Sequence, residues 1–152
     1  MKNKLAVITA ATALLFGAAG CASDSPRAEG GKEKVVYHVT DGEKDVNFVK
    51  RSLGNVRNHL NAAGKENVEI RVVMNGDGLG ILKAAAKDPQ IQASVDALKQ
   101  DGVKFDVCRN TLTARKIDPK KDLYDVDDKD IVPSGVATAA KLQQMGYSYL
   151  KP

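Results

Sequence analysis

The chain has 152 residues, of which 23 are Lys or Arg and 19 are Asp or Glu, so its formal net charge is +4. Two of the lysines lie in an N-terminal leader, without which the net charge is only +2, and the chain contains no Trp, four Tyr and three Phe. A charge this close to balance and so few aromatic side chains argue against nucleic acid as a partner and against a base-stacking platform.

The first 21 residues have the plan of a bacterial secretory leader. Two lysines, at positions 2 and 4, precede an apolar run from Leu5 to Phe16, and small residues then lead to Cys21. The run is shorter than the roughly 20 residues that a membrane-spanning helix needs, so we expect a signal peptide and export. Residues 18–21 resemble the lipobox of bacterial lipoproteins, which predicts lipidation of Cys21. Cleavage after a small residue is the alternative.

The segment after the leader predicts how the folded part is attached. Residues 22–33 are rich in Ser, Gly, Pro and charge, which is typical of a flexible tether. The remaining residues, 34–152, suffice for one domain with one hydrophobic core. Acyl chains on Cys21 would hold this domain on a membrane surface, so we expect an exported, periplasmic protein with a lipid anchor.

Strand and helix patterns alternate along the domain. β-Branched runs predict strands, and apolar residues spaced three and four apart predict helices. In chain order these are a strand at 35–39, a helix at 45–63, a strand at 68–74, helices at 79–87 and 91–100, a strand at 103–108, a helical turn at 111–116, a strand at 131–132, a helix from 135 and a strand at 147–150. The alternation predicts an α/β fold, a three-layer sandwich around a mainly parallel sheet of about five strands.

Four polar, glycine-bearing or reactive segments each follow a predicted strand. They are residues 40–42, 75–78, 108–111 and 133–135. Ligands of open parallel sheets bind beyond the carboxyl ends of the strands. We therefore expect all four segments to share one edge of the molecule and to form the functional site.

Cys108 is the candidate reactive residue at this edge. It ends an apolar strand, and the only other cysteine, Cys21, lies in the predicted leader. An unpaired thiol in an exported protein is a candidate nucleophile, which must react as the thiolate. Arg109 next to it, and the amides of Asn110 and Thr111 at the start of a helix, would lower its pKa. The alternative is that Cys108 is a small buried hydrophobic residue.

The other segments have weaker motifs. Residues 75–78, Asn75-Gly76-Asp77-Gly78, either form a tight turn or bind an anion on their amides, although Asp77 would repel a phosphate. Ser134, before Gly135, is predicted to cap the following helix, and no serine-hydrolase motif surrounds it.

The histidines and the acidic stretch give no metal-binding spacing. His38 lies within the first predicted strand and is expected in the core or at an edge, and His59 is expected to be solvated on the long helix. Residues 125–130 lack the glycine and the glutamate of a calcium loop. We therefore expect no metal and no cofactor. Nothing in the sequence brings a histidine to Cys108, although such a pair stays open.

Several segments together carry a family resemblance. Residues 103–112, VKFDVCRNTL, and 132–136, VPSGV, followed by 142–149, LQQMGYSY, resemble the DsrE/DsrF-like family. The strand at 37–39 and the turn at 75–78 also fit. The resemblance implies a compact α/β sandwich that assembles as a homo-oligomer, a trimer or a hexamer. It also implies that Cys108 matches a thiol that carries sulfur as a persulfide.

The export signal departs from the resemblance, because the sulfur relays of better-studied relatives work in the cytoplasm. It argues against thiolation of transfer RNA. Our leading hypothesis is a sulfur-handling protein of the cell envelope, in which Cys108 accepts sulfane sulfur from an unidentified donor and passes it on. The residues expected to hold the substrate are Asn75, Gly76, Asp77, Gly78, Arg109, Asn110, Thr111, Ser134 and Gly135. The alternative is a non-catalytic module for anion binding or assembly, tethered to the membrane.

Overall fold

The computed structural model describes residues 31–152, so the predicted leader, Cys21 and most of the predicted tether lie outside the described residues. Five strands form one sheet in the order β4-β3-β2-β1-β5, and every neighbouring pair is parallel. The strands are β1 (Glu33–Val39), β2 (Val68–Met74), β3 (Lys104–Cys108), β4 (Ile131–Val132) and β5 (Ser148–Leu150). The predicted α/β fold with a parallel sheet is confirmed.

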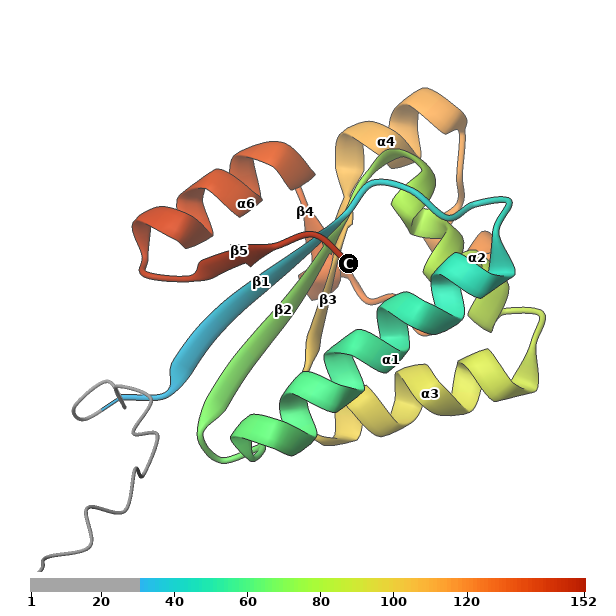
Figure 1. Cartoon of the computed structure of the whole chain (residues 1–152). Helices are drawn as coiled ribbons and strands as arrows, with labels where there is room; N and C mark the ends of the chain where they lie inside the picture. Colours follow the sequence, from blue (N-terminus) through green and yellow to red (C-terminus); the bar gives the residue numbers. More distant parts are fainter. Residues whose placement is uncertain (1–30) are drawn as a thin grey trace, which may run out of the picture.

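The helices cover the two faces of the sheet unequally (Figure 1). On one face lie α1 (Val46–Ala63), α2 (Gly80–Ala85) and α3 (Pro89–Gln100), and α6 (Gly135–Gln144) covers the other. The chain steps from β1 to β4 in one direction and then returns through α6 to place β5 on the far side of β1. The fold is therefore the three-layer sandwich that the alternation of elements predicts.

Capping side chains fix where the two long helices begin. Asp45 accepts a hydrogen bond of 2.9 Å from the Phe48 amide at the start of α1, and Asp88 accepts one of 2.8 Å from the Gln90 amide at the start of α3. α1 ends at Gly64, whose φ of +84° favours glycine. β1 begins at Glu33, one residue inside the predicted tether, because Glu33 pairs with Val68 of β2.

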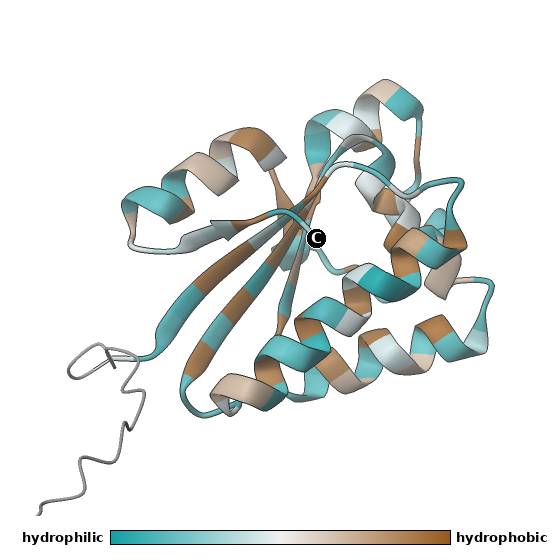
Figure 2. Cartoon of the chain, in the orientation of Figure 1, coloured by the Kyte–Doolittle hydropathy of each residue, from teal (hydrophilic) through white to brown (hydrophobic). Residues whose placement is uncertain are grey.

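The hydrophobic core is divided by the sheet into a larger and a smaller part. The larger part joins alternate residues of β1, β2 and β3 to α1, α2 and α3. The smaller part, under α6, contains Val36, Val73, Leu142 and Tyr147. Figure 2 shows hydrophobic and hydrophilic residues alternating along β2. The α6 face also carries a charged pair, in which Arg71 donates two hydrogen bonds, of 2.7 and 2.5 Å, to the buried Asp106. The α6 face of the sheet therefore contains an ion pair with a buried carboxylate.

Short helices near the site differ from the prediction. α4 (Arg109–Arg115) begins directly after Cys108, two residues earlier than the predicted turn, because the backbone bends at the end of β3. Residues Gly76–Leu79 form a 3-10 helix ahead of α2. Further along lie α5 (Pro119–Asp122) and a second 3-10 helix, Asp128–Asp130.

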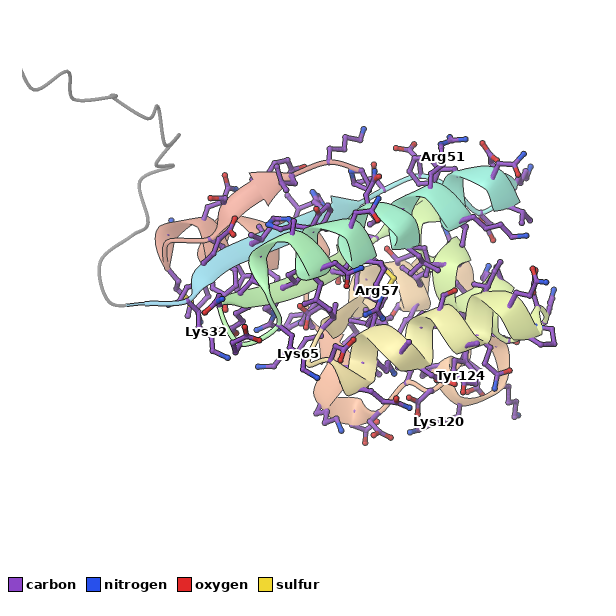
Figure 3. The ribbon with its side chains drawn as sticks, turned by 60° about the horizontal axis from the view of Figure 1, so that its bottom comes forward. Lys32, Arg51, Arg57, Lys65, Lys120 and Tyr124 are labelled. Carbon is purple, nitrogen blue, oxygen red and sulfur yellow. The ribbon has the colours of Figure 1, made fainter. Side chains whose placement is uncertain are left out.

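The connection between α4 and β4 is anchored on α3. Tyr124 donates a hydrogen bond of 3.0 Å to Asp96, and Lys99 forms an ion pair of 2.7 Å with Asp125. Figure 3 shows Tyr124 close to α3. The acidic side chains of this stretch are thus partly paired with lysines. Among the described residues no group of three or more His, Cys, Asp or Glu side chains is arranged to hold a metal ion. Within residues 31–152, no helix has both the length and the apolar character that crossing a bilayer requires.

Candidate functional site

The thiol of Cys108 lies at the carboxyl edge of the sheet, on the α6 face. Its neighbour Val107 belongs to the larger core on the opposite face, and side chains alternate along a strand. Cys108 itself is 4% exposed. Arg109 and Asn110, which follow it, are exposed. The sulfur atom is therefore covered but lies close to the surface.

Hydrogen-bond donors surround this sulfur atom. Four groups lie close enough to the sulfur to lower the pKa of the thiol: the amides of Asn110 and Thr111 and the Thr111 hydroxyl, in the first turn of α4, and the amide of Gly135 at the start of α6. The side chain of Cys108 makes no capping hydrogen bond to α4. Cys108 belongs to neither apolar cluster. The surroundings of this thiol thus combine low exposure with four polar contacts.

These contacts change the ionisation of the thiol. Burial alone would raise the pKa of Cys108, because it disfavours the charged form. The donor groups of Gly135, Thr111 and Asn110 beside the sulfur outweigh burial and hold the pKa of Cys108 below its ordinary value. The arrangement therefore favours the thiolate, which is the nucleophilic form of cysteine.

The loop after β2 is joined to this site by one hydrogen bond. The Gly76 amide donates to Oγ1 of Thr111 at 3.0 Å. The same hydroxyl lies beside the sulfur of Cys108 and lowers the pKa of the thiol. Thr111 therefore links the predicted segments 75–78 and 108–111.

The remaining residues of this loop have different surroundings. The carboxylate of Asp77 is exposed and forms an ion pair of 2.6 Å with Arg115. Gly78 is buried, and a Cβ built on it would lie 2.0 Å from the carbonyl oxygen of Val39. Asp77 and Gly78 thus shape the turn, and Asn75 and Gly76 are the residues of the loop that reach the surroundings of the thiol.

Two further predicted residues flank the site without touching the sulfur. Arg109 is exposed and, within residues 31–152, forms no ion pair and no side-chain hydrogen bond. Ser134 accepts a hydrogen bond of 3.4 Å from the Ala137 amide and so caps α6. The cap places the next residue, Gly135, with its amide toward Cys108.

His38 and Tyr149 also lie close to this edge of the sheet, and neither was predicted as part of the site. His38 is 7% exposed. Its Nδ1 lies 2.9 Å from the hydroxyl of Tyr149, and its Nε2 lies 2.5 Å from Oδ1 of Asn75. The signal available in the sequence was the position of His38 one residue before the end of the first predicted strand.

The other histidine lies away from the site. His59 of α1 lies 3.0 Å from the Tyr37 hydroxyl and 3.1 Å from Glu33, on the face opposite α6. Neither histidine contacts Cys108 among the described residues.

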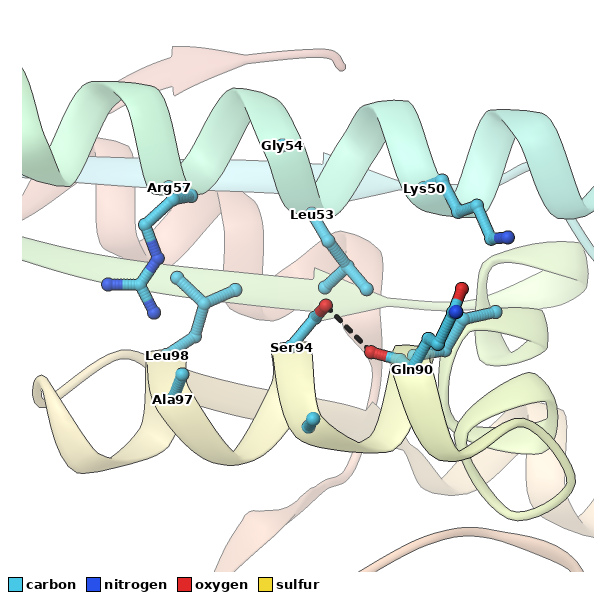
Figure 4. Close-up of a pocket in the computed structure, with 10 residues that line it drawn as sticks. Lys50, Leu53, Gly54, Arg57, Gln90, Ser94, Ala97 and Leu98 are labelled. Carbon is cyan, nitrogen blue, oxygen red and sulfur yellow. Dashed lines mark hydrogen bonds between the residues drawn. The ribbon is translucent and has the colours of Figure 1, made fainter.

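A groove of about 460 Å³ lies on the α1–α3 face and is separate from Cys108 (Figure 4). Its walls are α1 and α3, with Leu53, Ile91 and Leu98 among its apolar lining. Lys50 and Arg57 lie toward opposite ends of it in the close-up. Arg57 forms an ion pair of 2.5 Å with Asp101. The groove contains none of the residues predicted for the site.

Comparisons with known proteins agree with the fold and with the family resemblance. The model of the DsrE/DsrF-like family matches residues 54–152. The structure is similar to that of MTH1491, a protein of unknown function from Methanobacterium thermoautotrophicum, with 31% identity and a TM-score of 0.66. That similarity covers 80% of this chain and 100% of the other. No curated protein matches the chain.

Proposed function

We propose that this chain, which belongs to the DsrE/DsrF-like family, carries sulfur on Cys108 in the cell envelope. Family membership connects the chain with sulfur relay. The proposal adds the residue, the chemical step and the location. The observation that supports it most is the set of hydrogen-bond donors around the Cys108 sulfur, which stabilise an anion there.

The chemical step is a transfer of sulfane sulfur. The Cys108 thiolate attacks the outer sulfur of a donor such as thiosulfate or polysulfide, and a new S–S bond forms. The S–S bond of the donor breaks, and sulfite or a shortened polysulfide leaves with the electron pair. Cys108 becomes a persulfide anion, so charge and sulfur balance. An acceptor thiolate then takes the outer sulfur and restores the Cys108 thiolate.

The residues of this chain act on the charge that Cys108 carries in each state. The amides of Gly135, Asn110 and Thr111 and the Thr111 hydroxyl face the anionic sulfur. Donors held in place before reaction stabilise charge without reorganising. Arg109, exposed beside the thiol, is proposed to attract the anionic donor. No metal and no organic cofactor take part in the proposed step.

The location and the assembly are further parts of the proposal. Export and lipidation at Cys21 are supported by the pattern of the first 21 residues. The homo-oligomer, a trimer or a hexamer, is supported by the family resemblance. Membrane fractionation of wild type and Cys21→Ser tests the anchor, and light scattering of the purified protein tests the assembly.

Sulfur uptake is tested on the full chain. The reduced protein is incubated with thiosulfate or polysulfide, and peptide mass spectrometry locates any gain of one sulfur atom. We expect the gain on the peptide with Cys108, with none in Cys108→Ser. Cys21→Ser is the matched control, because it removes the other cysteine and keeps this site. Absence of the gain in wild type, or its persistence in Cys108→Ser, would refute the proposal.

The low exposure of Cys108 supports the alternative function, a non-catalytic module for anion binding or assembly. In that case the Cys108 thiol only packs against its neighbours in the interior, and it reacts slowly. Iodoacetamide labelling of native and urea-unfolded protein near neutral pH separates the two functions. Native labelling as fast as unfolded labelling supports sulfur transfer, because the thiolate fraction sets the rate. Labelling only after unfolding supports the alternative.

A further inference from the structure

We propose that His38 and Asn75 are positioning residues that hold the Gly135 amide against the sulfur of Cys108. The inference rests on the proposed use of Cys108 and names residues that set its reactivity. Neither residue is bonded to the sulfur itself among the described contacts. Their effect on the sulfur passes from His38 to Asn75 by a hydrogen bond and from Asn75 to Gly135 by packing.

His38, Asn75 and Cys108 lie on one face of the sheet at its carboxyl edge. His38 pairs in register with Val73, which belongs to the small core under α6. Side chains alternate along a strand, so Asn75, two residues after Val73, leaves the sheet on the same face. Met74 pairs with Val107, and continuing this register places Asn75 beside Cys108. Neighbouring strands lie about 4.8 Å apart.

The first contact of the path fixes the side chain of Asn75. The oxygen Oδ1 of Asn75 can only accept a hydrogen bond, so the His38 Nε2–H donates to it at 2.5 Å. The other ring nitrogen, Nδ1, lies 2.9 Å from the Tyr149 hydroxyl. His38 is buried between these two partners. The amide of Asn75 is therefore held in one orientation.

The second contact joins Asn75 to α6. A Cβ built on Gly135 would lie 3.0 Å from both Cβ and Oδ1 of Asn75, closer than ordinary van der Waals contact. The backbone of Gly135 therefore packs directly on the side chain that His38 holds. The Gly135 amide in turn is one of the donor groups that lie beside the Cys108 sulfur. A shift of Asn75 releases the backbone that carries this donor.

The substitution Asn75→Ala leaves the charged groups around the thiol unchanged. Arg71 and Asp106, on the same face, pair with each other. Arg109 of α4 is exposed, and the residues of β4 are Ile131 and Val132, which carry no charge. On the other side of Asn75, His38 and Tyr149 are the titratable groups. Asn75→Ala removes no titratable group, so a change in the pKa of the thiol that Asn75→Ala shares with His38→Ala reports the position of the Gly135 amide.

The test compares the pKa of Cys108 in variants of the full chain. The absorbance of the thiolate is measured as a function of pH. The absorbance of Cys108→Ser is subtracted, which removes the contribution of every other group. His38→Ala and Asn75→Ala are expected to raise the midpoint by about 0.5–1 unit, the effect of weakening one hydrogen bond. At a pH below both midpoints the thiolate fraction then falls about three- to tenfold. His38→Gln is expected to retain the wild-type midpoint, because its amide nitrogen can donate to Asn75.

His59→Gln is the matched control, since His59 also bonds to a tyrosine but lies on the other face. An unchanged midpoint in folded His38→Ala and Asn75→Ala overturns the inference, and so does an equal shift in His59→Gln. If His38→Ala does not fold, Asn75→Ala decides in the same way. Sulfur uptake is measured in parallel. Shifted midpoints without uptake by wild type refute only the proposed function, and uptake without shifted midpoints refutes only this inference.

Discussion

The amide of Gly76 donates a hydrogen bond of 3.0 Å to the Oγ1 of Thr111, so the loop after β2 is fastened to the helix that begins at Cys108. The hydroxyl that accepts this bond also lies beside the Cys108 sulfur and lowers the pKa of the thiol. The buried Thr111 thus contacts the backbone of the turn after β2 and lies beside the Cys108 sulfur at the end of β3.

Replacing Thr111 with valine is expected to raise the pKa of Cys108 by about 0.5–1 unit, because one donor to the sulfur is lost. It leaves the Gly76 amide without its partner, so the free energy of unfolding is expected to fall by about 1–2 kcal/mol. Thiolate absorbance and urea unfolding measure the two effects. Thr113→Val is the control, because Thr113 is an exposed residue of the same helix. Equal effects of the two substitutions would contradict the assigned role of Thr111.

Local patterns predicted those parts of the fold that depend on neighbouring residues. The strand Val68–Met74 is found with the predicted bounds, since its β-branched residues and the following Asn-Gly turn mark both ends. The position of Cys108 at a strand end is likewise confirmed. Helix α4 starts earlier than predicted because its start depends on the bend after Cys108, which no capping side chain marks.

The contacts that complete the site depend on sheet order, which the sequence pattern does not reveal. His38 meets Tyr149 because β5 returns beside β1, and it meets Asn75 because β1 and β2 pair in one register. Gly135 reaches Cys108 because α6 crosses to the other face of the sheet. Each of these contacts joins residues far apart in the chain, so predicting the segments was possible and predicting their partners was not.

Glycine 78 is expected to be required for folding, because a methyl group there would lie 2.0 Å from the carbonyl oxygen of Val39. Backbone atoms cannot give way as a flexible side chain can. Gly78→Ala is expected to lower the free energy of unfolding by at least ~2 kcal/mol, measured by urea unfolding. A smaller loss of stability would show that the turn can widen at little cost in free energy.

Gly54→Ala is the opposite case and the matched control. Gly54 lies inside α1, and a Cβ built on it meets nothing within 4 Å. Alanine is the better helix former, so this substitution is expected to stabilise the protein by up to about 1 kcal/mol.

The hydroxyl of Tyr147 is expected to titrate well above the ordinary tyrosine pKa. Burial, and then its hydrogen bond of 2.6 Å to Glu69, raise the pKa of Tyr147 to about 12. Its protonated form therefore stabilises the fold below the ordinary tyrosine pKa of about 10, and this stability is lost as pH rises toward 12. Tyrosinate absorbance of wild type minus Tyr147→Phe measures the midpoint. A midpoint near 10 would contradict the bond to Glu69.

The ionisation of Cys108 also predicts how stability depends on pH. The pKa of Cys108 is lower in the folded protein than in the unfolded chain, since the donor groups of Gly135, Thr111 and Asn110 are gathered around the sulfur only in the fold and outweigh burial. Between the two pKa values the unfolded chain binds more protons, so stability rises with pH there. The contribution is complete above the unfolded pKa and is lost as pH falls through the folded one.

Urea unfolding of wild type and Cys108→Ser, under reducing conditions, isolates this contribution, because every other titrating group is common to both proteins. The difference in the free energy of unfolding is expected to grow in favour of wild type as pH rises from the folded pKa of Cys108 to its ordinary value of 9.0. The growth is about 1.4 kcal/mol for each unit that separates the two pKa values. It should then level off. A difference that stays constant or shrinks over this range means that the fold does not stabilise the thiolate, and the chemistry proposed for Cys108 would lose its physical basis.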